Sequence, residues 1–216
     1  MIIGLDVGGT HTDVVLLGGK GLERRIKVPT DTSALFQTVL SGLERITADI
    51  APELISHAVL STTLTTNAIV QKKLEPVGMI VTCGPGIGPE HYRTGEHYYR
   101  IAGGLDHSGR EIAGLDESGV KAAAEKMRAA GIRYVGVAGK FSVRNPAHEK
   151  RIGEIISPLF EKVFLGHRIS GGFNFPRRIA TTFLNAAVYP VHKAFFEADK
   201  SSLKQKGITL PIYILK

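Results

Sequence analysis

Cysteine is almost absent from this chain of 216 residues, and long apolar runs are absent altogether. The single cysteine, Cys83, excludes an intrachain disulfide and fits a reducing compartment. No apolar stretch approaches the roughly 20 residues that cross a bilayer. The N-terminus also lacks the basic and apolar regions of a secretory signal. We therefore expect a cytoplasmic protein that does not bind a membrane.

Long basic runs are missing too, although the net charge is +7. The basic residues are scattered in short pairs, and no aromatic platform is interleaved with them: Arg24-Arg25, Lys72-Lys73 and Arg177-Arg178. This pattern indicates solvated faces, or a surface for phosphate or a partner, and argues against nucleic acid as the ligand.

The first thirteen residues are the most informative segment. An apolar run over residues 2–7 carries one carboxylate, Asp6, and breaks at Gly8-Gly9 before a second apolar run begins at Val14. Glycines allow backbone N–H groups to approach an anion, and successive N–H groups form an anion-binding concavity. Asp6 at the strand end suits a hydrated Mg²⁺ held against a phosphate. The segment therefore predicts a phosphate site, with an ordinary hairpin as the alternative.

Other phosphate loops fit less well. A strand pattern, not a helix, follows the glycines, which excludes the dinucleotide-binding fingerprint, and no Gly-Lys-Ser/Thr follows for a Walker loop. The segment is similar to the first phosphate motif of the actin, sugar kinase and Hsp70 superfamily, Asp-x-Gly-Gly-Thr-x-Thr.

The order of elements predicts an α/β fold. Residues 2–7, 12–17 and 22–28 read as an antiparallel meander, and alternating helices and strands follow. This matches a ribonuclease-H-like, actin-like ATPase half with a mixed sheet. We expect a first core part at 1–84, an inserted region at 85–115 with hairpins at 97–101 and 105–112, a helix–strand continuation at 116–205, and the first strand of a second lobe at 206–216. Because the chain stops inside an apolar strand, we expect a truncated or split protein.

Two further groups of residues suggest chemistry without matching a motif. His91, His97 and His107 lie in the inserted region, but their irregular spacing fits solvated loop histidines better than metal ligands. Cys83 follows an apolar strand, where a buried strand end is a simpler interpretation than a nucleophile.

Three segments resemble the hydantoinase A/5-oxoprolinase family, in its N-terminal portion. The first is residues 4–13, Gly-Leu-Asp-Val-Gly-Gly-Thr-His-Thr-Asp. The second is residues 61–70, which are similar to the family's His-Gly-Thr-Thr-x-x-Thr-Asn-Ala. The third is residues 178–188, which are similar to its Arg-x-x-Thr-x-x-Leu-Asn-Ala-x-Val. The likeness covers nearly all of this chain, but only a third to a half of a family member.

The resemblance implies an ATP-dependent amidohydrolase of cyclic amides such as 5-oxoproline or N-methylhydantoin, or a related carboxylase subunit. ATP and Mg²⁺ are the implied cofactors, and a missing lobe or second subunit, in a homo- or hetero-oligomer, is the implied partner. The residues that it implies fall into three sets. The catalytic set is Asp6, which also holds the metal, Thr12 and Asp13. The phosphate-binding set is Gly8, Gly9, Thr10, His11, Thr12 and Lys27. The substrate-binding set is Thr62, Thr63, Thr66, Asn67, Arg178 and Asn185.

Several alternatives stay open. Lys27 also fits a solvated edge lysine, and Thr62 and Thr63 also fit a helix cap. Leu60-Ser61 stands where the family has His-Gly, which puts the cyclic-amide substrate in doubt. A sugar or acyl kinase of the same superfamily, or a non-catalytic regulatory subunit, would keep the same loop. In every case the part of a family member beyond this portion would be needed for activity.

Overall fold

The computed structural model describes residues 1–205 and 211–215. The chain divides into two compact units. The first unit comprises Met1–Lys73 and Pro190–Lys216, and the second comprises Leu74–Tyr189. Within the described ranges, no helix combines the length and the apolar character that a membrane span requires.

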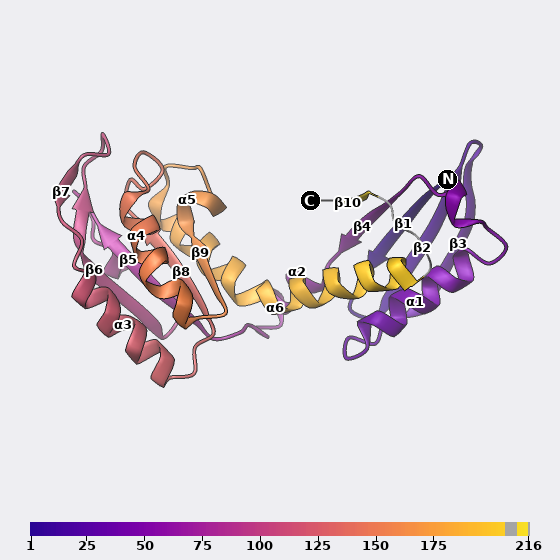
Figure 1. Cartoon of the computed structure of the whole chain (residues 1–216), viewed down its shortest axis with the longest axis horizontal. Helices are drawn as coiled ribbons and strands as arrows, with labels where there is room; N and C mark the ends of the chain where they lie inside the picture. Colours follow the sequence, from indigo (N-terminus) through magenta and orange to yellow (C-terminus); the bar gives the residue numbers. More distant parts are fainter. Residues whose placement is uncertain (206–210, 216) are drawn as a thin grey trace. The chain divides into compact units, whose positions relative to one another are not determined.

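The first unit is built on a five-stranded mixed sheet (Figure 1). Strand β1 pairs antiparallel with β2, and β2 pairs antiparallel with β3. Strand β4 runs parallel to β1, and β10 runs parallel to β4. The strands, in their order across the sheet, are β10 (Ile212–Ile214), β4 (His57–Thr62), β1 (Ile2–Val7), β2 (His11–Gly18) and β3 (Gly21–Pro29).

One face of this sheet carries the hydrophobic core of the first unit. Alternate side chains of β1 and β2 are buried there, against helix α1 (Leu35–Ile46) and the last turns of helix α6 (Phe175–Gln205). Because successive side chains of a strand point to opposite faces of the sheet, Asp6 and Asp13 lie on the face away from this core. The short helix α2 (Leu64–Val70) follows β4. A 3-10 turn, η1 (Pro52–Leu54), precedes β4.

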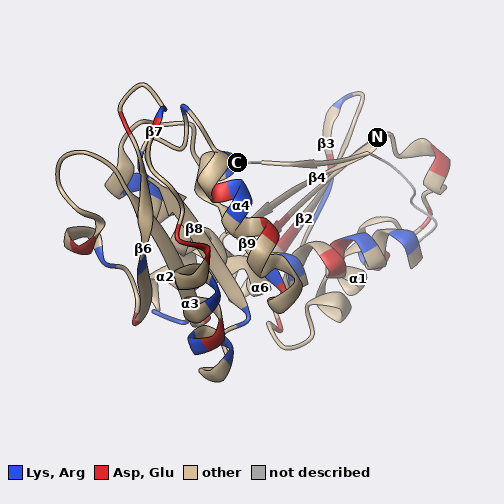
Figure 2. Ribbon diagram, turned by 60° about the vertical axis from the view of Figure 1, so that its left-hand side comes forward, with Lys and Arg blue, Asp and Glu red and all other residues tan. Residues whose placement is uncertain are grey.

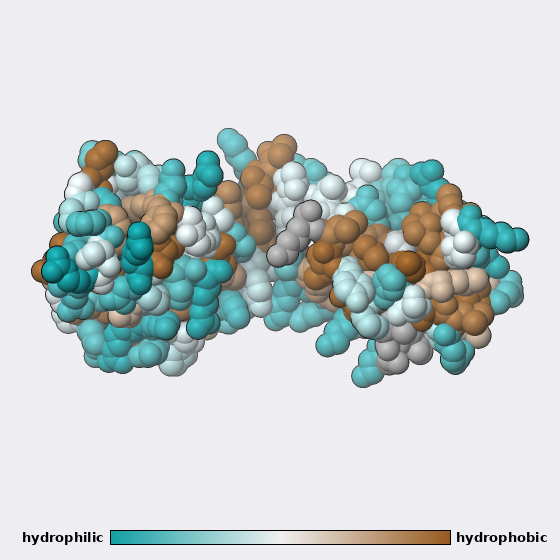
Figure 3. Space-filling model, turned by 90° about the horizontal axis from the view of Figure 1, so that it is seen from above, coloured by the Kyte–Doolittle hydropathy of each residue, from teal (hydrophilic) through white to brown (hydrophobic). Residues whose placement is uncertain are grey.

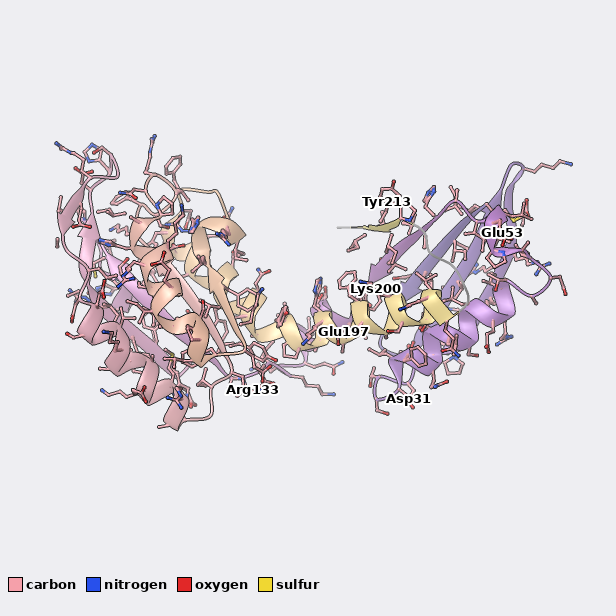
Figure 4. All side chains as sticks on the ribbon, viewed as in Figure 1. Asp31, Glu53, Arg133, Glu197, Lys200 and Tyr213 are labelled. Carbon is pink, nitrogen blue, oxygen red and sulfur yellow. The ribbon has the colours of Figure 1, made fainter. Side chains whose placement is uncertain are left out.

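The outer face of the sheet retains apolar side chains. Leu17 is 37% exposed, and Tyr213 on β10 is 57% exposed. Figure 3 shows hydrophobic side chains gathered on a face of the first unit, and Figure 4 labels Tyr213 on β10. Apolar side chains thus remain exposed on this face of the sheet.

The second unit is an α/β/α sandwich around a second five-stranded sheet. Strands β6, β5, β8 and β9 run parallel, and β7 is antiparallel to β6. Helices α3 and α4 cover one face, and the first part of α6 covers the other. The elements are β5 (Val77–Cys83), η2 (Pro89–Tyr92), β6 (His97–Leu105), β7 (Glu111–Ala113), α3 (Glu117–Ala129), β8 (Tyr134–Gly139), α4 (Ala147–Ile156), η3 (Ser157–Leu159), β9 (Lys162–Leu165) and α5 (Gly166–Ile169).

The expected mixed α/β architecture is confirmed, with differences in detail. Residues 97–105 form one strand that pairs parallel with β5, so the expected hairpin at 97–101 was wrong, whereas the expected hairpin at 105–112 is confirmed by the pairing of Leu105 with Glu111. The hairpin that does form joins β6 to β7, and its turn is held by the Asp106 carboxylate, which accepts the N–H groups of Ser108 and Arg110.

The division of the chain also differs from the expected boundaries at residues 84, 115 and 205. The first boundary lies before β5 because that strand begins a sheet of its own. The strand at 212–214 joins the first sheet beside β4, whereas we expected it to begin a second lobe. Residues 206–210 and 216 of that expected segment lie outside the described residues.

Charged residues of both signs lie on helices α1, α3, α4 and α6 (Figure 2). Arg25 and Lys27 on β3 form ion pairs with Asp13 on β2.

Candidate functional site at the turn between the first two strands

The turn between β1 and β2 is closed tightly by its glycines. The Gly8 N–H donates to the His11 carbonyl at 3.0 Å. A Cβ atom on Gly8 would lie 2.9 Å from that carbonyl oxygen, and one on Gly9 would lie 3.1 Å from Asn67 Nδ2. Within the described part of the chain, the N–H groups of Gly9 and Thr10 donate to no other group. Two free N–H groups on a turn without side chains suit a phosphate oxygen.

The first turn of α2 lies against this glycine turn. The Thr62 hydroxyl donates to the Val7 carbonyl at 2.7 Å and accepts the Leu64 N–H at 3.1 Å, so Thr62 fixes the start of the helix. Thr63 Oγ1 lies 3.9 Å from the place that a Gly8 Cβ would occupy. Thr66 is exposed on the helix. The structure therefore brings Thr63 and Asn67 to the turn and gives Thr62 a structural role.

Two carboxylates lie directly opposite each other beside the turn. Asp6 and Asp13 are partners across β1 and β2, and Asp6 is exposed. Lys27 Nζ lies 2.7 Å from one Asp13 oxygen, and an Arg25 nitrogen lies 3.5 Å from the other. The hydrogen bond from Lys27 holds the pKa of Asp13 below its usual value. In this structure Lys27 is thus the partner of Asp13, and its expected contact with a phosphate stays a prediction.

The carboxylates suit Mg²⁺ better than a metal held by protein ligands alone. Among the described residues, no group of three or more His, Cys, Asp or Glu side chains is placed to bind a metal. Mg²⁺ commonly needs only one or two carboxylates, with waters and substrate phosphates completing its shell. Asp6, exposed at the end of its strand, fits that role.

The side chain of Thr12 points away from the open turn. It is fully buried, and its hydroxyl lies 2.8 Å from the Thr30 hydroxyl. The alternation along β2 turns Thr12 inward together with Val14 and Leu16. The neighbouring His11 is exposed, with Nδ1 3.2 Å from the Thr10 hydroxyl. A role of the Thr12 hydroxyl in catalysis stays a prediction that this buried pairing does not favour.

A pocket of about 600 Å³ opens beside the glycine turn, within the first unit. Its size is in the range of small-molecule sites. It contains two residues that the sequence predicted, Gly9 and Asn67, and nine that it did not: Thr32, Leu35, Leu64, Ala68, Gln71, Lys73, Pro190, Val191 and Ala194. No sequence pattern distinguished these nine, because α1, α2 and α6 meet here only in the folded chain.

The two remaining predicted residues lie in the second unit. Arg178 is fully buried, and its guanidinium donates to the carbonyls of Gly139 and Gly172, each at 2.7 Å. Asn185 donates to the Thr181 carbonyl of its own helix at 2.8 Å. Arg178 thus anchors α6 to the second sheet, and substrate binding by either residue stays a prediction.

Comparison with known proteins decides the family. The pattern of the hydantoinase/oxoprolinase N-terminal region matches residues 2–160, which is most of the chain. The chain belongs to the hydantoinase/oxoprolinase family. This confirms the resemblance carried by residues 4–13 and 61–70.

Curated proteins match along nearly the whole chain. Caprolactamase subunit alpha of Pseudomonas jessenii is 27% identical over 97% of this chain and 34% of its own length. The acetophenone carboxylase gamma subunit of Aromatoleum aromaticum is 26% identical over 95% of this chain and 33% of its own length. The chain therefore spans about a third of the length of these relatives.

Solved structures of hydantoinase/oxoprolinase relatives share the fold. A nucleotide-free acetone carboxylase, from a study of ATP-dependent acetone carboxylation, aligns with a TM-score of 0.86 at 20% identity, over 99% of this chain and 36% of that one. The ATP-dependent caprolactamase from Pseudomonas jessenii aligns with a TM-score of 0.78 at 24% identity, over 99% and 35%. At these identities the likeness establishes the fold alone.

Proposed function

We propose that this chain is the nucleotide-binding portion of an ATP-dependent amidohydrolase, with the turn at Gly8-Gly9 as its phosphate site. The observation that carries the proposal is the pair of free N–H groups on Gly9 and Thr10, beside the exposed carboxylate of Asp6. Solved structures named as ATP-dependent enzymes share the fold, and the turn lies within the part of this chain that matches the family, which supports an actin-like nucleotide site.

Bound Mg-ATP would supply a phosphoryl group that turns an amide oxygen into part of a good leaving group. Phosphoryl transfer needs mainly positioning and charge stabilisation. Gly9 and Thr10 would orient a phosphate through their N–H groups. Asp6 would hold Mg²⁺. Asp13 adds negative charge on the same face of the sheet, and its ion pair with Lys27 partly neutralises that charge.

We propose that the pocket beside the turn receives a small cyclic amide. Its walls are largely apolar, from Leu35, Leu64 and Val191, which suits the carbon atoms of a ring. Asn67 adds an amide that can pair with an amide group of the substrate, and it lies against Gly9. A ring in this pocket would therefore lie next to the proposed phosphate position.

We also propose that this portion requires further protein for full activity. Its relatives are about three times as long, and two of them are named as subunits. The apolar side chains on the outer face of the first sheet, Leu17 and Tyr213 among them, give a partner a surface to bind. On this proposal, the isolated portion binds ATP weakly and hydrolyses it negligibly.

Titration calorimetry of Mg-ATP into the complete protein tests the phosphate site. We expect binding that is lost in Asp6→Asn, because the amide cannot replace a magnesium-binding carboxylate. Glu53→Gln is the matched control: it makes the same chemical change at an exposed residue of the same unit, in η1 (Figure 4).

Each outcome of this titration is decisive. Loss of binding in Asp6→Asn alone supports the proposal. Absence of Mg-ATP binding in the unaltered protein, or equal binding by both variants, would contradict it.

A further inference from the structure

The second sheet has an open edge at β9. Within the described ranges, β9 pairs only with β8, and β7 forms the opposite edge of this sheet (Figure 1). An edge strand presents a row of backbone N–H and C=O groups without partners, to which another extended chain can bind. The four residues of β9 therefore offer a further strand hydrogen bonds along about 10 Å of backbone.

A groove of about 550 Å³ lies along this edge. All four residues of β9 line it, although successive side chains of a strand point to opposite faces of a sheet. A cavity that every residue of a strand lines must lie at the open edge of that strand and not over one face. The other lining residues come from α4, from the residue after α4 and from α5: Lys150, Gly153, Glu154, Ser157, Arg168 and Ile169.

Helix α4 forms one wall of the groove and is packed closely against β9. A Cβ atom on Gly153 would lie 3.2 Å from Leu165 Cδ2, so the helix backbone lies directly on the strand's side chains. Gly153 is buried, and its carbonyl accepts the hydroxyl of Ser157. This packing lies within the second unit, and the groove is formed without any contribution from another chain.

Three cations from three elements surround the groove. Lys150 lies on α4, Lys162 begins β9, and Arg168 lies in α5. All three side chains are exposed, and none has an ion pair, a hydrogen bond or a ring contact among the described residues. In contrast, Arg133 and Arg151 of the same unit each contact two glutamates. The positive charges at the groove are therefore available to a ligand.

The acidic residue of the groove does not cancel this charge. Glu154 lies 3.1 Å from Arg151, so its carboxylate already has a cation of its own. Protection of the sheet edge is also an incomplete explanation. A lysine on an edge strand hinders unwanted pairing, which accounts for Lys162 but not for Lys150 and Arg168 on the helices. A groove with this excess of positive charge attracts an acidic ligand.

We propose that this groove binds an acidic, extended segment of a partner protein. The segment adds a strand beside β9 through main-chain hydrogen bonds, and its carboxylates pair with the three cations. Val163 and Ile169, both partly exposed, supply apolar contacts for the side chains in between. A compact anion such as phosphate would use the cations but not the row of backbone groups. The inference is confined to the second unit and does not depend on the phosphate site.

Selection of short random peptides from a display library against the complete protein tests the proposal without a known partner. We expect the enriched peptides to combine Asp and Glu with β-branched residues and to lack proline, as an added strand requires. An enriched peptide is then synthesised with a fluorescent label, and its Kd for the complete protein is measured by anisotropy.

Charge reversal measures the role of the cations. We expect Lys162→Glu and Arg168→Glu each to raise the Kd of the peptide about tenfold, because an attraction to an acidic ligand becomes a repulsion. Lys126→Glu is the matched control: it makes the same chemical change at an exposed lysine of α3 that does not line the groove. It should leave the Kd unchanged. All three side chains are exposed, so the variants should fold.

Methylation of the peptide's backbone nitrogens tests the added strand. Alternate N–H groups of a strand point to opposite sides, so two complementary peptides can be made, each methylated on one side only. We expect one of them to bind about tenfold or more weakly, because it has lost the donors that face β9, and the other to retain its Kd.

Three results would overturn the proposal. One is that acidic peptides are not enriched, even if inorganic phosphate binds the protein. Another is an equal Kd for Lys126→Glu and the two groove variants, which would place the peptide elsewhere on the surface. The last is an equal Kd for the two methylated peptides, which would show that no strand is added.

Discussion

Each unit of this chain buries one carboxylate completely, and the two carboxylates differ in their hydrogen-bond partners. Glu149 in the second unit accepts hydrogen bonds from Gly139 and His167. Asp199 in the first unit is equally buried, but neither of its oxygens has a hydrogen-bond partner among the described residues. Burial raises the pKa of Asp199 to about 7. The comparison shows that two equally buried carboxylates can differ completely in hydrogen bonding.

The difference follows from the architecture of each unit. In the second unit the carboxyl ends of the parallel strands bring backbone N–H groups and the start of α5 to Glu149. In the first unit Asp199 lies on the α6 face that packs near Phe195 and Leu203 in an apolar core, where the strands keep their N–H groups in the sheet. A polar cluster can therefore position a functional group in the second unit, whereas burial without hydrogen-bond partners raises the pKa of Asp199 in the first unit.

Removing the satisfied carboxylate should have the largest effect on stability. We expect Glu149→Ala to lower the free energy of unfolding by about 5 kcal/mol, at the upper end for breaking a buried ionic network. The substitution leaves the N–H groups of Gly139 and His167 without an acceptor. Urea denaturation followed by circular dichroism measures the change. Glu111→Ala, which removes an exposed carboxylate that also pairs with a histidine, should cost far less; equal losses would contradict the comparison.

The unsatisfied carboxylate should make stability depend on pH. Because the pKa of Asp199 is higher in the folded state than in the unfolded chain, its contribution is fully present below about pH 4 and is lost as the pH rises through about 7. The difference in pKa corresponds to a loss of about 4 kcal/mol. Asp199→Asn should remove this pH dependence and stabilise the protein at pH 8, as measured by denaturation from pH 4 to 8. An unchanged pH profile in the variant would show that Asp199 is solvated or paired.

A smaller effect distinguishes the two faces of the first sheet. Leu16 is fully buried and its neighbour Leu17 is 37% exposed. We expect Leu16→Ala to cost about 3 kcal/mol and Leu17→Ala less than about 1 kcal/mol in the isolated chain. Denaturation of both variants measures the costs. A large cost at Leu17 would show that the outer face is covered in solution.

Much of the first unit could be predicted from the sequence because its signals are local. The alternation of β1 and β2 around Gly8-Gly9 predicted both strands and the turn between them. β6 was missed because its glycine, tyrosine and histidine content resembles a loop. Its parallel pairing with β5 depends on a partner that no local pattern identifies. The position of β10 beside β4 is long-range in the same way.

In the candidate site, too, the sequence predicted residues of local motifs but not the contacts that depend on distant segments. Sequence motifs identified Gly9 and Asn67, which the fold brings together. They also named Thr12, whose inward direction is set by the strand period, and Arg178, which anchors a helix. The contact of Glu149 with His167 joins residues of two elements 18 positions apart, and no spacing rule indicated it.

The position of a bound nucleotide tests the central claim most directly. A crystal structure of the complete protein with Mg²⁺ and a non-hydrolysable ATP analogue would locate the phosphates. We predict phosphate oxygens within hydrogen-bond distance of the N–H groups of Gly9 and Thr10, with Mg²⁺ next to Asp6. Phosphates bound elsewhere, with the turn at Gly8-Gly9 empty, would contradict the assignment of this turn as the phosphate site.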